Sequence, residues 1–227
     1  MNTKTFLFSA LVAALGFAAS DSASAASGTQ SASYAPGLII PDNGSGVSDT
    51  ETFSFPGAAT ISSVQVFLNI SGGWNGDYYA WLRHGTTGFA VLLNRAGVSG
   101  GSAYGYGDNG FNITLDDSAS NGDIHFYQGV VNPQGAALTG LWQPDGRNVD
   151  PNIVSGLTPR SAMLGSFGGL DPNGDWTLFV ADDSPGGIGT LAGWGLTVTV
   201  PEPGTLGFLA LAGIGLLAQH LRNKIAA

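Results

Sequence analysis

The sequence predicts an all-β domain, an antiparallel β-sandwich of the jelly-roll type. Apolar and polar residues alternate in short runs, such as "ISSVQVFLNI" at 61–70 and "WGLTVTV" at 194–200. A period of two is typical of strands with one buried face. Asn-Gly occurs five times and glycine 36 times, which favours tight turns between strands because both residues tolerate positive φ angles.

The clearest strands come in a fixed order along the chain. Residues 61–70, 111–115, 176–180 and 194–200 each place their large apolar side chains on one face. The stretch 140–164 shows the least pattern, and we expect a long loop there with at most one short strand. No composition shift divides 38–200, so we predict one domain, which is long enough to bury a substantial core.

The N-terminus is typical of a secretory signal peptide. Lys4 precedes an apolar run at 6–19, and small residues follow up to Ala25. This arrangement predicts residues 1–25 as a segment that signal peptidase removes at Ala25, since the run is shorter than the ~20 residues that a membrane span needs. Residues 26–37 are small and polar, which predicts a flexible leader.

Charge and cysteine content exclude several function classes. Residues 26–200 contain four arginines and no lysine, against fourteen acidic residues. Such a surface repels nucleic-acid phosphates, so we predict no nucleic-acid partner. The chain has no cysteine, which excludes disulfides, iron–sulfur clusters, thiolate zinc sites and cysteine nucleophiles.

Two short motifs match catalytic or cofactor signatures without their structural context. Residues 97–101 read G-x-S-x-G, but no helix pattern follows the serine. Residues 105–110 read G-x-G-x-x-G but lead into a predicted strand. Neither His84 nor His125 has flanking residues that resemble a hydrolase. We therefore predict that the protein is not an enzyme.

Acidic residues are better candidates for a site. The D-x-N-x-D start at Asp171 is not an EF-hand, because Trp176 stands where that loop needs glycine. A looser calcium site is one hypothesis, since calcium takes several oxygen ligands from neighbouring loops. The alternative is that the acids cap turns and face water. The candidate ligands lie at predicted strand ends: Asp77, Asp116, Asp117, Asp182 and Asp183.

Aromatic residues form a second candidate set, because exposed rings can stack on sugars. Trp81 and Trp142 fit a core position equally well. The set comprises Trp74, Tyr78, Tyr79, Trp81, Tyr104, Tyr106 and Trp142.

Residues 38–200 resemble the P domain (Homo B domain) that follows the catalytic domain of kexin- and furin-like subtilisin proteases. The opening "IPDNGSGVSDT", the stretch 61–95 and the segment "FNITLDDSA" match in the family's order. The closing segment is the most specific, with Gly174, Trp176, Leu178, Asp182, Gly189, Leu191, Trp194 and Leu196 in register. The departures are Tyr78, where the family has leucine, and 84–87, which replaces a proline-bearing loop. The resemblance implies a jelly-roll sandwich that stabilises or regulates a neighbouring protease.

Residues 201–227 resemble the PEP-CTERM sorting signal. Pro201, Glu202 and Pro203 precede an apolar run at 204–218, and Arg222 and Lys224 follow it. The resemblance implies handling by exosortase in Gram-negative bacteria that make extracellular polysaccharide. The basic residues would hold the end of a hydrophobic sorting helix on the cytoplasmic side, giving a transient membrane association. A permanent anchor is the alternative.

Together these features predict an exported protein of the cell surface or extracellular matrix, with a non-catalytic binding or structural sandwich. Calcium and extracellular polysaccharide are the candidate ligands. The alternative is an accessory domain that stabilises or regulates a separately encoded subtilisin-like protease. A glycan-processing enzyme is a weaker alternative, since no pair of catalytic carboxylates stands out.

Overall fold

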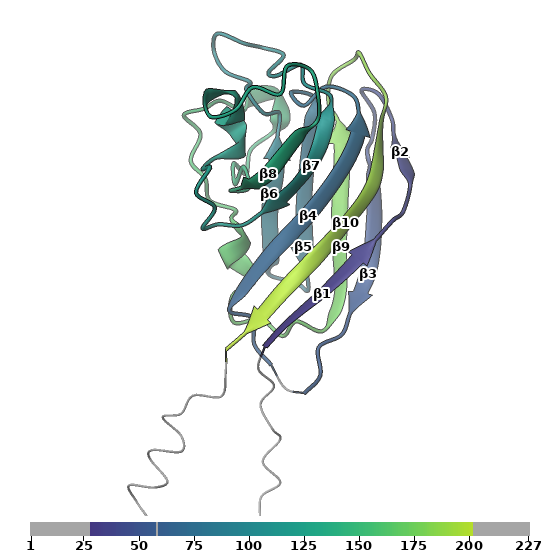
Figure 1. The fold of residues 1–227 in the computed structure, drawn as a ribbon, viewed down its shortest axis with the longest axis vertical. Helices are drawn as coiled ribbons and strands as arrows, with labels where there is room; N and C mark the ends of the chain where they lie inside the picture. The colour runs from purple at the N-terminus through teal and green to yellow at the C-terminus, as the bar shows by residue number, and fades with distance from the viewer. Residues whose placement is uncertain (1–27, 58, 202–227) are drawn as a thin grey trace, which may run out of the picture.

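The computed structural model describes residues 28–57 and 59–201. This part of the chain forms ten strands and three short 3₁₀ helices, with the strands in two sheets packed face to face (Figure 1). The predicted all-β sandwich is confirmed. The predicted signal peptide, with cleavage at Ala25, lies outside the described residues.

The larger sheet has the spatial order β1-β10-β4-β7-β8, and β2 also pairs with β10. Its strands are β1 (Gly28–Tyr34), β2 (Leu38–Ile40), β4 (Ser63–Gly72), β7 (Gly110–Leu115), β8 (Leu138–Trp142) and β10 (Gly189–Val200). The smaller sheet has the order β3-β9-β5-β6. Its strands are β3 (Val47–Phe53), β5 (Tyr78–His84), β6 (Gly88–Asn94) and β9 (Gly174–Asp182).

One neighbouring pair, β7 and β8, is parallel, whereas the other pairs are antiparallel. A parallel pair needs a long crossover. Residues 116–137 provide it and contain the helix η1 (Ile124–Gly129). The stretch 140–164 is largely irregular, as predicted, and holds the end of β8 and the short helix η2 (Pro151–Ile153). The third helix, η3 (Leu164–Phe167), follows directly.

The prediction of a flexible leader at 26–37 is wrong for residues 28–34. These residues form β1, an edge strand paired with β10 along its whole length. Its polar face is held by hydroxyl pairs, Thr29 with Thr199 at 3.0 Å and Ser31 with Thr197 at 2.8 Å. Small polar residues suggested a loose segment, but the open edge of β10 offers backbone partners that composition does not reveal.

The core lies between the sheets and is built around three fully buried tryptophans, Trp142, Trp176 and Trp194. Each indole N–H donates to an acceptor: the carbonyl of Thr139, the carbonyl of Pro172 and the carboxylate of Asp49. Buried indoles need such partners because an unpaired N–H is costly. The alternation in 176–180 and 194–200 thus marks the buried face as predicted.

The two ends of the described chain lie side by side, since Gly28 pairs with Val200. Both ends are at the lower end of the sandwich in Figure 1. The loops that follow β4 and β9 lie at the opposite end, because Gly72 pairs with Gly189 at the start of β10. Within the described ranges, no helix has the length and apolar character needed to cross a membrane. The predicted sorting helix falls outside them.

Candidate functional site

The structure divides the five predicted calcium ligands between two places. Asp77 directly precedes β5 and Asp182 ends β9, and these strands pair so that Tyr78 faces Asp182. The backbone N–H of Asp183 donates to the carbonyl of Asp77 at 2.9 Å. Asp77, Asp182 and Asp183 therefore meet at the end of the sandwich away from the chain ends, and we call them the loop-end acids.

The loop-end acids carry carboxylate oxygens that are buried without hydrogen-bond partners. Asp77 is 1% exposed and Asp182 is 0% exposed. Both oxygens of Asp77, and Oδ2 of Asp182 and of Asp183, accept no hydrogen bond of good geometry from the described residues, and the side chain of Ser184 is near enough only to lower the pKa of Asp77. Buried polar atoms are almost always paired. Four unpaired oxygens from three neighbouring acids therefore need a physical explanation.

Burial changes the protonation of these acids. It raises the pKa of Asp77 to about 6, the nearby charge of Asp182 adds to the rise, and Arg95 opposes it. Burial also raises the pKa of Asp182 and of Asp183. An ionised carboxylate is unfavourable in a poorly solvated place unless a positive charge compensates it. The site is therefore short of positive charge.

The groups around the loop-end acids compensate them only in part. Oδ1 of Asp182 accepts from the N–H of Ser184 at 3.2 Å. The guanidinium of Arg95 is buried, but Nε and Nη2 donate to the carbonyls of Gly76 and Ala103. Arg95 therefore supplies a favourable field without a direct ion pair.

The loop end offers two carboxylates to a calcium ion, which would need further oxygen ligands. In residues 28–57 and 59–201, no group of three or more His, Cys, Asp or Glu side chains is placed to hold a metal ion. An ion here would rest on the carboxylates of Asp77 and Asp182, completed by backbone carbonyls or water. Calcium accepts such mixed oxygen shells of six to eight ligands.

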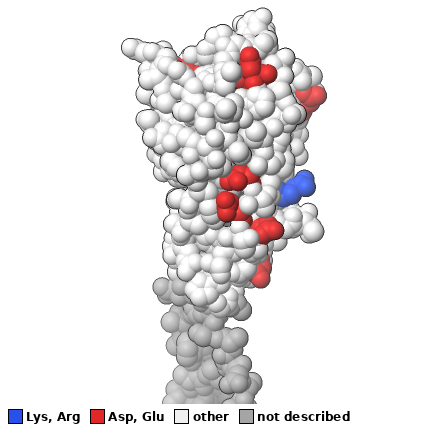
Figure 2. All heavy atoms as spheres, turned by 90° about the vertical axis from the view of Figure 1, so that its right-hand side faces the viewer, with Lys and Arg blue, Asp and Glu red and all other residues white. Residues whose placement is uncertain are grey.

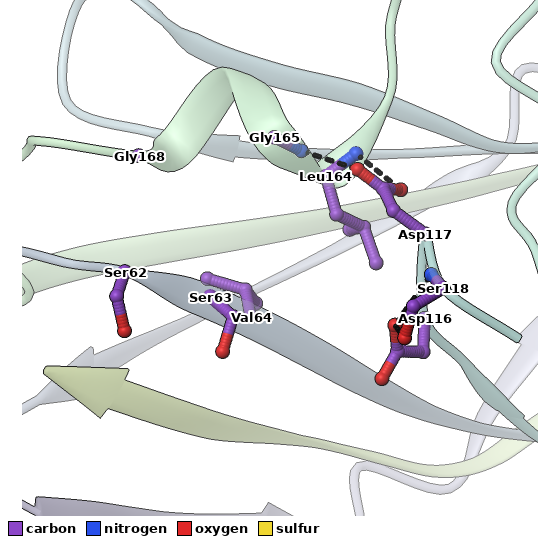
Figure 3. A pocket seen from close by; sticks show the side chains of 9 residues that line it. All are labelled: Ser62, Ser63, Val64, Asp116, Asp117, Ser118, Leu164, Gly165 and Gly168. Carbon is purple, nitrogen blue, oxygen red and sulfur yellow. Dashed lines mark hydrogen bonds between the residues drawn. The ribbon is translucent and has the colours of Figure 1, made fainter.

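Asp116 and Asp117 lie elsewhere, after the far end of β7, and all four of their carboxylate oxygens accept hydrogen bonds. Figure 3 shows those from Ser118, Leu164 and Gly165. Asp116 accepts from the side chain of Gln65 at 2.6 Å and from Ser118. Burial raises its pKa, but these hydrogen bonds outweigh burial and lower it overall. Asp117 accepts from the N–H groups of Leu164 and Gly165, at 3.0 and 2.7 Å.

These two acids border a pocket of about 250 Å³. Its lining residues are Ser62, Ser63, Val64, Asp116, Asp117, Ser118, Leu164, Gly165 and Gly168. Figure 3 shows the carboxylates turned toward their donors. The turn-capping interpretation therefore holds for Asp116 and Asp117, and the two sets of acids do not form one site.

No hydrogen bond joins a histidine to Ser99, the serine of the G-x-S-x-G motif, in the described structure. Both ring nitrogens of His125 are occupied, Nδ1 by Asp145 at 2.8 Å and Nε2 by the carbonyl of Val98 at 2.9 Å. His84 is stacked on Trp176, with its nitrogens on two backbone carbonyls. Ser99 lies in a turn, bridged to Ser102. The loop interpretation of 97–101 is confirmed.

A buried polar network near the loop-end acids was missed from the sequence. The carboxylate of Asp108 accepts from Tyr127 at 2.7 Å, from Gln128 at 2.6 Å and from the N–H of Gly135 at 2.8 Å. Asn75 donates to Tyr127 and accepts from the N–H of Gly110. The Asn-Gly steps at 75–76 and 109–110 predicted both turns, but they did not predict that the two turns contact each other. The network ties the loop before β5 to the loop before β7.

The predicted aromatic set is also divided. Tyr78 and Trp142 are core residues. Tyr79 and Trp81 lie half-buried on the outer face of the smaller sheet, where Trp81 stacks on Phe179. Trp74 and Tyr104 are the exposed members, at 46% and 76%. Tyr106 packs edge-on against Tyr127.

Comparison with solved structures gives only distant likeness. A crystal structure of a serine protease of Aeromonas sobria in complex with its chaperone matches 77% of this chain at 17% identity, with a TM-score of 0.41. A second structure of the Aeromonas sobria protease matches 75% at 17% identity, with a TM-score of 0.39. The matched part is 26% of each of those chains. A search of curated proteins found no match.

The end of the chain has a specific match. Residues 199–222 match the family described as the PEP-CTERM protein-sorting motif. The match includes Pro201, Glu202, Pro203 and Arg222 of the predicted signal and stops short of Lys224. The chain therefore carries a PEP-CTERM sorting motif, which implies processing by exosortase, export and sorting to the cell surface.

Proposed function

We propose that this protein is a surface or matrix component whose β-sandwich has a non-catalytic binding or structural role, with a calcium ion at its loop end. The observation that carries the proposal is the set of three buried, unpartnered oxygens on Asp77 and Asp182. The charge of Asp182 adds to the effect of burial in raising the pKa of Asp77. A divalent cation would relieve that repulsion and give the free oxygens of Asp77 and Asp182 a common partner.

Calcium suits this place better than other common metals. The described residues near the loop end offer oxygen atoms, and the chain has no cysteine. Both ring nitrogens of His84 and of His125 already have partners. Hard oxygen ligands favour calcium or magnesium, and calcium tolerates the irregular shell that loops provide.

The ion would act on the loops rather than on a reaction. Asp77 ends the loop after β4, and Asp182 and Asp183 begin the loop after β9. A third loop joins them, because Gly44 donates to the carbonyl of Asp182 and Asp42 accepts from the N–H of Gly186. One ion would thereby hold three loops in a single arrangement.

Thermal unfolding of the full chain, in EGTA and then in millimolar calcium, tests the site. Calcium at 100 times its dissociation constant adds about 2.7 kcal/mol, which raises the Tm by roughly 5–10 °C for a domain of this size. Asp77→Asn should abolish the shift, and the matched control Asp116→Asn should keep it. The site is rejected if calcium leaves the Tm of the wild type unchanged, or if it shifts the Tm of Asp77→Asn as much as that of the wild type.

A second candidate role is an accessory domain for a separately encoded subtilisin-like protease. It is favoured by the P-domain pattern of the closing segment, whose Trp176, Leu178 and Trp194 are core residues here. Mixing the purified protein with such a protease from the same genome should raise the protease's Tm. An unchanged Tm and no complex on gel filtration would remove this candidate.

A further inference from the structure

A groove opens beside the loop-end acids, and no part of the proposed calcium site occupies it. It has a volume of about 450 Å³, within the ~300–1,000 Å³ typical of ligand sites. It lies between the loops that follow β4 and β9 and the loops that precede β7 and β8. Its lining residues are Gly72, Gly73, Trp74, Gly107, Asn109, Gly135, Gly187 and Ile188.

Trp74 is the aromatic residue of this groove, and it is held in place while nearly half exposed. Its six-membered ring packs on Gly186, where any Cβ would collide with it. Its carbonyl accepts from the N–H of Asp77 at 3.0 Å, which closes a tight turn. The side chain nevertheless remains 46% exposed. A large apolar surface is therefore available to a ligand in a fixed orientation.

The opposite wall is rigid because the buried network lies behind it. Asp108, between Gly107 and Asn109, is 3% exposed and accepts from Tyr127 and Gln128. Its Oδ1 accepts from the N–H of Gly135, a groove residue. A rigid wall lowers the entropic cost of binding.

The chemistry of the lining is neutral and polar. Five of the eight lining residues are glycine, so peptide groups rather than side chains form much of the surface. Asn109 is exposed and adds an amide donor and acceptor. No lining residue is charged. Acidic side chains outnumber basic ones on the face shown in Figure 2, and the net charge of the chain is −9. Anionic ligands are therefore disfavoured.

We propose that this groove binds a neutral polysaccharide of gluco-configured pyranose units. Such a ring carries only C–H groups on its two faces and hydroxyls around its rim. A C–H face would stack on Trp74, and the rim hydroxyls would bond to peptide groups of the glycine walls and to Asn109. The assignment rests on the proposed binding role of the exported domain and names its ligand class.

The position of the groove agrees with this use. The sorting motif begins at residue 199, at the end of β10, whereas Gly72 and Gly187 lie at the other end of the sandwich. A domain attached through its C-terminal end would present the groove outward, toward surrounding polymer.

Isothermal titration of the full chain with cellohexaose and with laminarihexaose tests the proposal, in a detergent without a sugar headgroup. The expected result is saturable binding to at least one of them. Trp74→Ala should weaken binding about tenfold or more, because stacking on an aromatic ring is lost. Gly107→Leu should block it, since a Cβ at Gly107 meets nothing within 4 Å and the side chain can enter the groove.

Gly100→Leu is the matched control, because Gly100 is equally unobstructed and lies outside the groove. It should bind as the wild type does. No binding of either glucan, equal binding by Trp74→Ala, or stronger binding of alginate oligosaccharides overturns the proposal. The calcium site is tested by the Tm, and the groove is tested by titration calorimetry. A failure of one proposal can therefore be told apart from a failure of the other.

Discussion

Two Asp-Asp pairs of this protein have opposite surroundings. Asp116–Asp117 follows β7, and Asp182–Asp183 is at the end of β9. In the first pair all four carboxylate oxygens accept hydrogen bonds. In the second pair each residue has a buried Oδ2 without a partner. The sequences alone, "LDDS" and "ADDS", are nearly the same.

The difference comes from what other segments bring to each pair. Asp117 meets the first N–H groups of η3, which have no side-chain cap of their own, and Asp116 meets the amide of Gln65. Asp182 meets another acid, Asp77, across the β5–β9 pairing. Asp116 and Asp117 cap neighbouring segments because hydrogen-bond donors surround them. Asp182 is a candidate cation ligand because a further carboxylate lies beside it.

The largest expected effect is an inverse pH dependence at the loop end. In buffer freed of calcium beforehand, the native state holds the proton of Asp77 up to about pH 6, whereas the unfolded chain releases it near 3.8. Stability should therefore fall as the pH rises from about 4 to 6, by about 2 kcal/mol after allowance for solvent screening. Urea titrations across this range measure it.

Asp77→Asn is the control for that measurement. It should remove the fall and leave the variant more stable than the wild type in EGTA near neutral pH. Calcium should reverse the order, because only the wild type can use the ion. A wild type whose stability rises with pH over this interval would contradict the assignment.

A smaller effect is expected at the satisfied pair. Asp117→Ala removes the acceptor of two N–H groups at the start of η3 and should cost about 1–2 kcal/mol. The loss should be the same with and without calcium, which separates Asp117 from Asp77. Urea titration of both forms measures it, and Ser120→Ala serves as a neighbouring exposed control. A calcium-dependent loss would contradict the separation of the two pairs.

The smallest effect concerns Asp116, whose lowered pKa has the opposite sign to that of Asp77. Its hydrogen bonds contribute stability above the unfolded pKa, and this contribution is lost as the pH falls below about 3.8. Gln65→Ala should weaken that acid sensitivity and cost about 0.5–1.5 kcal/mol near neutral pH. Acid titrations of the wild type and the variant measure it. Identical acid midpoints would show that the Gln65 contact contributes nothing.

Local patterns were sufficient for the strands with the clearest alternation and for the turns. The alternation at 61–70, 176–180 and 194–200 identified buried faces, and the Asn-Gly steps identified turns, including Asn43 with a φ of 47°. The edge strand β1 was missed because its partner, β10, is more than 160 residues away. A strand of small polar residues depends on that partner for its hydrogen bonds. The local composition does not indicate that the partner is there.

The sorting motif, the alternating strands and the acidic balance are properties of contiguous residues, and they can be recognised without a structure. The grouping of aspartates into sites cannot be recognised in this way. It depends on strand register, which sets Tyr78 opposite Asp182, and on donors from distant loops, such as Leu164 for Asp117. Burial and pairing are set by groups brought together only on folding, so tertiary structure alone divides these acids into caps and candidate ligands.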